Sequence, residues 1–164
     1  MSVLPFPEYK FRAVQDISAD FLARKSIEFL MLDLDNTLAP YKQALPLSAV
    51  TDWAAAVRAS GVKLCIVSNS RKEKRVRIFA VMLESPYVTR AGKPSPSKLL
   101  EVMRAGNVSP DKAALVGDQI YTDVLSARLA GITPILISPM DLRNPLLAIR
   151  YALEAPFRIR GRAE

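Results

Sequence analysis

The 164-residue chain contains no histidine and a single cysteine, Cys65. The absence of histidine excludes Ser-His-Asp and Cys-His catalysis, a histidine general base and zinc held by imidazole. A single cysteine excludes an internal disulfide and a thiolate metal cluster, and it favours a reducing compartment such as the cytoplasm. Carboxylates, hydroxyls and amines are left for catalysis, and they work most naturally with a hard cation such as Mg²⁺.

Long apolar runs and an excess of acidic residues are also absent. No stretch approaches the roughly 20 apolar residues that a membrane span needs. The N-terminus lacks the order of charged and apolar residues typical of a signal peptide and carries Pro5 and Pro7. The chain has 23 Lys and Arg against 16 Asp and Glu, a formal net charge of +7. This charge predicts attraction to nucleic acid, anionic lipid or phosphorylated substrates.

Length and composition indicate an ordinary globular protein. Half of the residues are hydrophobic and 24% are charged, which excludes a disordered chain. We expect a single domain over residues 1–164. Its core would lie at about 28–139, with an irregular N-terminal arm at 1–16 and a basic C-terminal segment at 141–164.

Short apolar runs alternate with helical patterns. The runs at 29–32, 62–67, 113–116 and 135–137, with a shorter one at 87–90, are typical of strands buried on both faces of a parallel sheet. Helical patterns lie at 18–25, 47–59, 70–83, 95–105, 120–130 and 144–153. This alternation predicts an α/β fold, a doubly wound, Rossmann-like three-layer sandwich whose mainly parallel sheet has about five strands.

Polar side chains follow several of the predicted strands. They are Asp33 and Asp35, then Ser68 and Asn69, then Asp118 and Asp123. Ligands of such sheets bind beyond the carboxyl ends of the strands. Carboxylates gathered there repel one another unless a cation neutralises them. The pattern therefore predicts a ligand site with a cation at this edge.

These residues also carry a family resemblance, over roughly 28–139. The stretch Asp33 to Leu38 (DLDNTL) resembles the signature of the haloacid dehalogenase superfamily. The other motifs of that superfamily follow in order, namely Ser68-Asn69 at a strand end, Lys93 before a helix, and Gly117-Asp118 followed by Asp123. With Lys93-Pro94 and GDQIYTD included, the pattern resembles the YqeG-type class IIIA phosphatases and the related mitochondrial phosphatidylglycerophosphate phosphatases.

The resemblance implies a Mg²⁺-dependent phosphomonoester phosphatase that works through an aspartyl-phosphate. Asp33 would be the nucleophile. Asp35 would be the general acid and would also offer its main-chain carbonyl to the metal. Lys93 would neutralise Asp33 and the charge that develops on the phosphoryl group. The plainer interpretations are two loop carboxylates and a solvated lysine.

The resemblance also implies the remaining contacts. Ser68, Asn69 and Lys93 would hold the phosphate, together with main-chain N–H groups of the following helix. Asp118 would bind Mg²⁺ directly alongside Asp33. Asp123 would bind it through water or would orient Lys93. A helix cap at Ser68 and a first-turn helix residue at Asp123 are the simpler interpretations.

The intervals between the motifs leave no room for a cap domain. Only 34 residues separate Asp33 from Ser68, and 24 separate Ser68 from Lys93. An open site suits a large or surface-bound substrate, or a lid from a second subunit, so the oligomeric state stays open. The cations at 71–77 and the basic, amphipathic stretch at 142–162 could contact an anionic membrane. They could equally form a solvated face and a packed helix with a basic tail.

Three functions remain open. We favour a large or lipid phosphate substrate, such as phosphatidylglycerophosphate, and a cytoplasmic protein that can lie at the inner face of the membrane. The alternatives are a phosphatase of a soluble phosphometabolite or nucleic-acid end with an oligomeric lid, and a non-enzymatic RNA- or ribosome-binding module. The one Trp, five Tyr and six Phe form no base-stacking motif, which counts against single-strand recognition.

Overall fold

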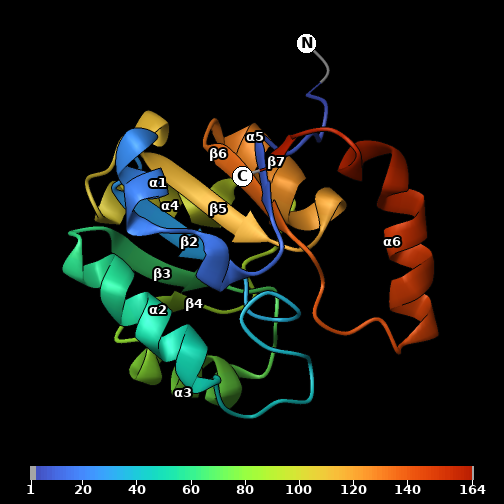
Figure 1. The fold of residues 1–164 in the computed structure, drawn as a ribbon, viewed down its shortest axis with the longest axis horizontal. Coiled ribbons are helices and arrows are strands. Elements are labelled where there is room, and N and C mark those ends of the chain that lie inside the picture. Colours follow the sequence, from blue (N-terminus) through green and yellow to red (C-terminus); the bar gives the residue numbers. More distant parts are fainter. Residues whose placement is uncertain (1–2, 164) are drawn as a thin grey trace.

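The computed structural model describes residues 3–163 and contains a sheet of seven parallel strands (Figure 1). The strand order is β4-β3-β2-β5-β6-β1-β7. The strands are β1 (Tyr9–Phe11), β2 (Phe29–Leu32), β3 (Lys63–Val67), β4 (Tyr87–Val88), β5 (Ala113–Gly117), β6 (Thr133–Ile137) and β7 (Arg162–Ala163). The predicted doubly wound α/β sandwich is confirmed.

Helices cover both faces of the sheet (Figure 1). One face packs against α1 (Ala19–Arg24), α2 (Ser48–Ala59) and α3 (Glu73–Met82), and the other packs against α4 (Ser97–Ala105) and α5 (Leu125–Ala130). Along β2, Leu30 and Leu32 enter the first core, whereas Phe29 and Met31 enter the second. Successive side chains of a strand point to opposite faces, so a strand with a core on both sides needs a continuous apolar run.

Two strands were not predicted. The five expected strands correspond to β2 to β6, but the N-terminal segment is not wholly irregular, since it contributes β1, which pairs with β6 and with β7. The rings of Tyr9 and Phe11 both pack edge-on against Phe21 of α1. β1 has three residues and β7 has two, which is too short for a recognisable strand pattern.

The helix boundaries differ from the predictions at two places. The helix predicted from Ser70 begins only at Glu73, because the hydroxyls of Ser68 and Ser70 accept hydrogen bonds from the main-chain N–H groups of Ser70 and Lys72, both at 3.1 Å. The last helix, α6 (Pro145–Arg158), continues past the predicted end at 153. Its predicted start is confirmed, since Asn144 accepts a hydrogen bond from the main-chain N–H of Leu146.

Only short segments of the chain lie beyond the carboxyl ends of the strands. Between β2 and β3 it forms a loop and α2, and between β3 and Lys93 it forms α3 and β4. Residues 3–163 therefore hold no separate cap domain. In the same part of the chain, no helix combines the length and the apolar character that crossing a membrane requires.

Candidate active site

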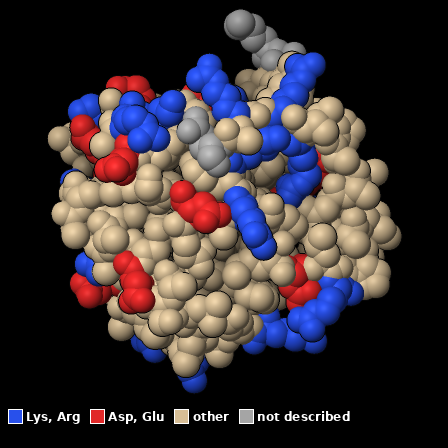
Figure 2. Space-filling view, viewed as in Figure 1, with Lys and Arg blue, Asp and Glu red and all other residues tan. Residues whose placement is uncertain are grey.

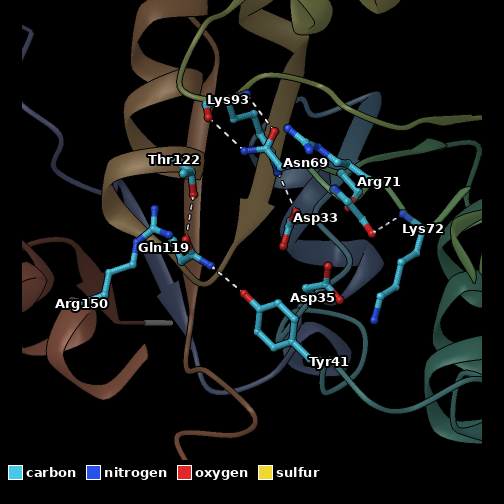
Figure 3. Close-up of a pocket in the computed structure, with 12 residues that line it drawn as sticks. Asp33, Asp35, Tyr41, Asn69, Arg71, Lys72, Lys93, Gln119, Thr122 and Arg150 are labelled. Carbon is cyan, nitrogen blue, oxygen red and sulfur yellow. Dashed lines mark hydrogen bonds and ion pairs between the residues drawn. The ribbon is translucent and has the colours of Figure 1, made fainter. Parts of the chain in front are cut away.

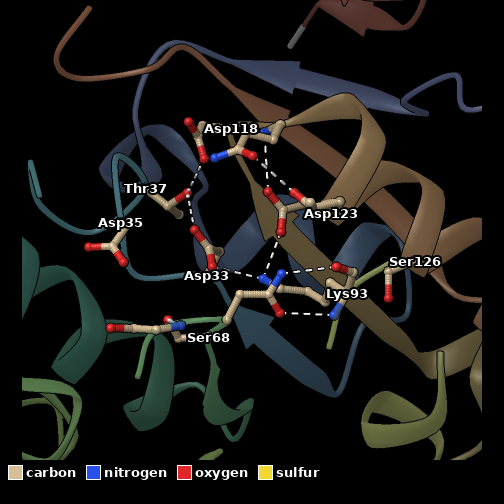
Figure 4. A network of polar contacts seen from close by, with 12 residues as sticks. Asp33, Asp35, Thr37, Ser68, Lys93, Asp118, Asp123 and Ser126 are labelled. Carbon is tan, nitrogen blue, oxygen red and sulfur yellow. Dashed lines mark hydrogen bonds and ion pairs between the residues drawn. The ribbon is translucent and has the colours of Figure 1, made fainter. Parts of the chain in front are cut away.

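Three adjacent strands place the candidate site. β2 lies between β3 and β5, and all three run in parallel, so their carboxyl ends meet at one edge. Asp33, Ser68 and Asp118 each follow the last residue of one of these strands. Lys93 lies in the loop before α4, and Asp123 lies in a single turn of π-helix, η3 (Ile120–Val124). All five side chains are buried (Figure 4).

Lys93 joins two of the carboxylates. Its Nζ lies 2.7 Å from Asp33 Oδ1 and 2.7 Å from Asp123 Oδ1. Asp123 Oδ2 accepts the main-chain N–H of Gln119 at 3.1 Å. Both oxygens of Asp123 therefore have protein partners, and the geometry suits a residue that orients Lys93.

A hydroxyl connects Asp33 with the third carboxylate. Thr37 Oγ1 lies 3.5 Å from Asp33 Oδ2 and 3.3 Å from Asp118 Oδ1. Because these two carboxylates face the same small space, their side chains could share a single ligand.

Burial and charge set the protonation of the site. Burial raises the pKa of Asp33 to about 7, although the nearby Lys93 ammonium opposes the rise. Burial likewise raises the pKa of Asp118 well above its usual value, and the charges of Asp123 and Asp33 add to the rise. Burial alone would lower the pKa of Lys93, but the Asp123 and Asp33 carboxylates outweigh it and raise that pKa. Lys93 therefore stays charged near neutral pH.

The three carboxylates fit a divalent metal ion. One oxygen each from Asp33, Asp118 and Asp123 lies within 4.8 Å of the others. Carboxylate oxygens are the donors that Mg²⁺ prefers. Lys93 balances only one of the three negative charges, so a divalent cation would neutralise the remainder. This donor set supports the predicted Mg²⁺, and its ligation by Asp33 and Asp118 stays a prediction.

Asp35 lies outside the carboxylate cluster. Its Oδ1 is 2.5 Å from Nη1 of Arg75. The same guanidinium donates to the main-chain oxygens of Gln43 at 2.8 Å and Pro40 at 3.0 Å. Arg75 belongs to α3, and these contacts hold the loop that contains Asp35 against this helix. Sequence reasoning placed Arg75 only in the run of cations at 71–77 and missed this contact.

The two predicted phosphate ligands after β3 differ in their surroundings. Ser68 is buried, and its hydroxyl caps the N–H of Ser70. The Asn69 amide binds the backbone of Lys93 on both sides, accepting from its N–H and donating to its carbonyl, each at 2.9 Å. The side chain of Asn69 therefore holds Lys93 in place. Contact of Ser68 or Asn69 with phosphate stays a prediction.

Five of the predicted site residues line a cleft of about 360 Å³ (Figure 3). Asp33, Asp35 and Lys93 line it together with Ser68 and Asn69. Its wall carries three further cations, Arg71, Lys72 and Arg150. Figure 3 shows Arg150 on the side of the cleft opposite Arg71 and Lys72. The cleft thus offers positive charge on two sides of the carboxylates.

Helix α6 contributes contacts that sequence reasoning missed. The Tyr151 hydroxyl donates a hydrogen bond to Asp118 Oδ2. Both terminal nitrogens of Arg158 donate to the main-chain oxygen of Asp118 at 2.8 Å. Buried Glu154 lies between them on the same helix face and pairs with Arg158 at 3.5 Å. The spacing of three and four residues was the available signal, because it places all three side chains on one helix face.

Comparisons with known proteins agree with the motifs. A family model described as haloacid dehalogenase-like hydrolase matches residues 20–131. Over 134 residues the chain is 28% identical to a probable phosphatase, YqeG, of Bacillus subtilis, covering 82% of this chain and 77% of that protein.

Solved structures share the fold. An uncharacterized protein from Listeria monocytogenes serotype 4b aligns with a TM-score of 0.57 at 17% identity, over 79% of this chain and 98% of that one. The cobalt-bound deoxy-D-mannose-octulosonate 8-phosphate phosphatase of Haemophilus influenzae aligns with a TM-score of 0.56 at 10% identity, over 81% and 90%. Because the family model spans most of the chain and includes Asp33, Lys93, Asp118 and Asp123, the chain belongs to the haloacid dehalogenase-like hydrolases, which confirms the predicted family and the prediction of an enzyme.

Proposed function

We propose that this hydrolase is a magnesium-dependent phosphomonoester phosphatase that forms an aspartyl-phosphate on Asp33. The observation that carries the proposal is the meeting of Asp33 and Lys93 at the floor of an open cleft, with Asp118 buried beside Asp33 and joined to it through Thr37. The likeness to a probable phosphatase supports the same activity.

In the first step, a carboxylate oxygen of Asp33 attacks phosphorus while the bond from phosphorus to the alcohol oxygen breaks. Lys93 holds Asp33 Oδ1 at 2.7 Å, which fixes the orientation of the nucleophile and offsets negative charge. Bound Mg²⁺, held by Asp33 and Asp118, would offset the charge on the phosphoryl oxygens.

Asp35 would move the protons of both steps. As general acid it protonates the departing alcohol oxygen, and as general base it then takes a proton from the water that attacks the aspartyl-phosphate. This second step releases inorganic phosphate and restores Asp33. Since Arg75 binds Asp35 in this structure, proton donation requires that ion pair to separate.

The test is hydrolysis of an aryl phosphate in the presence of Mg²⁺. We expect Asp33→Asn to lower kcat by at least about 10³-fold, because an amide cannot act as the nucleophile. Asp111→Asn is the matched control, since Asp111 is exposed and lies outside the cleft. A folded Asp33→Asn enzyme with wild-type turnover would exclude Asp33 as the nucleophile.

Within this activity we propose a large or lipid phosphate substrate such as phosphatidylglycerophosphate. Three α6 side chains support it, since Leu146, Ile149 and Leu153 are 77%, 59% and 66% exposed. Figure 2 shows Lys and Arg side chains at both ends of this helix. A helix with exposed apolar and cationic side chains can rest on an anionic lipid surface. A strong preference for soluble sugar or nucleotide phosphates over lipid phosphates in mixed micelles would exclude this substrate class.

A further inference from the structure

A second cleft adjoins the candidate active site. It has a volume of about 690 Å³, and it shares Tyr41 and Lys72 with the cleft above Asp33. Its other walls are Lys42 and the segment around the N-terminus of α6, from Asp141 to Leu147. A molecule bound at Asp33 could therefore extend past Tyr41 and Lys72 into this second space.

The second cleft carries uncompensated positive charge. Lys42, Lys72 and Arg143 line it, and Asp141 is the acidic residue among its lining. Both oxygens of Asp141 are already engaged by the Arg143 guanidinium, at 3.0 and 2.8 Å. Within residues 3–163, neither Lys42 nor Lys72 has an ion-pair partner, and both are exposed. Both ammonium groups are therefore free to bind an anion.

Two of these three cations are surplus to what the reacting phosphate needs. In the proposed mechanism Lys93 and the metal already offset the charge of the phosphate above Asp33. Lys42 and Arg143 do not line that first cleft. Figure 2 shows this positive charge over the loop before α2 and the start of α6, at the lower right of the molecule. A second anionic group on the substrate would match its position.

We propose that the second cleft receives the alcohol part of the substrate and selects alcohols that carry a second phosphate. This inference rests on the proposed phosphatase function and names the substrate class of the same site. Ammonium and guanidinium groups bind phosphate oxygens through charge-assisted hydrogen bonds. The second phosphate could be the phosphodiester of a lipid headgroup or the other end of a soluble bisphosphate.

The experiment measures kcat/KM for two pairs of substrates in the presence of Mg²⁺. The soluble pair is glycerol bisphosphate and glycerol phosphate, and the lipid pair, in mixed micelles, is phosphatidylglycerophosphate and phosphatidic acid. Each pair differs in the second phosphate. We expect the wild-type enzyme to prefer the doubly phosphorylated member of at least one pair by about 10-fold or more. The pair that shows the preference identifies the source of the second phosphate.

The variants test whether the second cleft causes the preference. Replacing the lysine that lines the second cleft alone, Lys42→Gln, should lower the preference at least about three-fold while kcat/KM for the singly phosphorylated substrate changes less than about two-fold. Lys74→Gln is the matched control, because it removes the same charge from an exposed lysine of α3 that lines neither cleft. The preference should persist in this control.

The outcomes separate the two proposals. If no phosphate monoester is hydrolysed, the phosphatase function itself fails. If esters are hydrolysed but neither pair shows a preference, or if Lys42→Gln slows both members of a pair equally, the second-phosphate site is overturned. A preference lost equally in Lys74→Gln would also overturn it, because net charge alone would then explain the effect.

Discussion

Gly117, the last residue of β5, leaves the space that the Asp123 carboxyl group occupies. A Cβ atom at position 117 would overlap the Cβ, Cγ and Oδ2 atoms of Asp123. The need for glycine here comes from this close approach to a side chain, and the ion pair between Asp123 and Lys93 depends on it.

At the residue scale we predict that Gly117→Ala lowers kcat by about 10²-fold in a protein that still folds. The methyl group displaces Asp123, and displacement of a positioning group by about 1 Å can cost this much. Steady-state kinetics with an aryl phosphate, with circular dichroism to check folding, measures the effect.

Gly106→Ala serves as the matched control for that variant. A Cβ atom at position 106 would make no contact shorter than 3.4 Å, and Gly106 lies at the end of α4 away from the cleft. Equal kcat values for the two variants would show that the close approach at Gly117 has no bearing on turnover.

At the scale of elements, α6 holds Asp118, the proposed metal ligand, in position. Tyr151 contacts one oxygen of Asp118 and Arg158 contacts its main-chain carbonyl. A residue that orients a metal ligand affects metal affinity more than it affects the chemical step. The helix that carries exposed apolar side chains on its outer face thus holds the proposed metal ligand with its inner face.

We therefore predict that Tyr151→Phe raises the Mg²⁺ concentration required for half-maximal activity by about 10-fold. Activity at saturating Mg²⁺ should change much less. Titration of activity with Mg²⁺ gives both numbers. Tyr121→Phe is the control, because its hydroxyl donates to the Leu153 carbonyl on the same helix and does not touch Asp118. An unchanged Mg²⁺ titration for Tyr151→Phe would count against a role in metal binding.

The elements also show what the sequence can and cannot reveal. β2 to β6 were predictable because each places apolar side chains in core clusters on both faces of the sheet. β1 and β7 were not, since edge strands of three and two residues leave no periodic pattern. Asp33 and Asp118 each follow a recognisable strand, and Lys93 belongs to a recognisable motif. Tyr151, in contrast, contacts a carboxylate 33 residues away. The spacing within α6 indicates which side chains share a helix face, but it does not indicate which residue that face contacts.

At the scale of the whole molecule, the buried carboxylates make the free energy of unfolding depend on pH, and bound metal would change it as well. The folded protein raises the pKa of Asp33 from 3.8 to about 7, so between these pH values the folded chain binds a proton that the unfolded chain releases. The free energy of unfolding contributed by Asp33 therefore falls as pH rises through this window. A divalent cation would reverse the loss, because it binds the ionised carboxylates.

We predict that the rise in Tm caused by Mg²⁺, relative to EDTA, grows between pH 5 and pH 7.5. At 100 times the dissociation constant, bound Mg²⁺ would stabilise the protein by about 2.7 kcal/mol. Differential scanning calorimetry at several pH values measures the rise, which should be smaller in Asp118→Asn. A rise that is independent of pH, or identical in that variant, would place the bound ion elsewhere.

The reacting carboxylates follow strands at the centre of the sheet, whereas the cations at the rim belong to a loop and to the start of α6. In the proposed assignment, selectivity and chemistry are thus divided between parts of the fold that can change separately. A graft that exchanges only residues 41–46, beyond Asp33, Asp35 and Thr37, could redirect this scaffold toward another ester without rebuilding its catalytic floor.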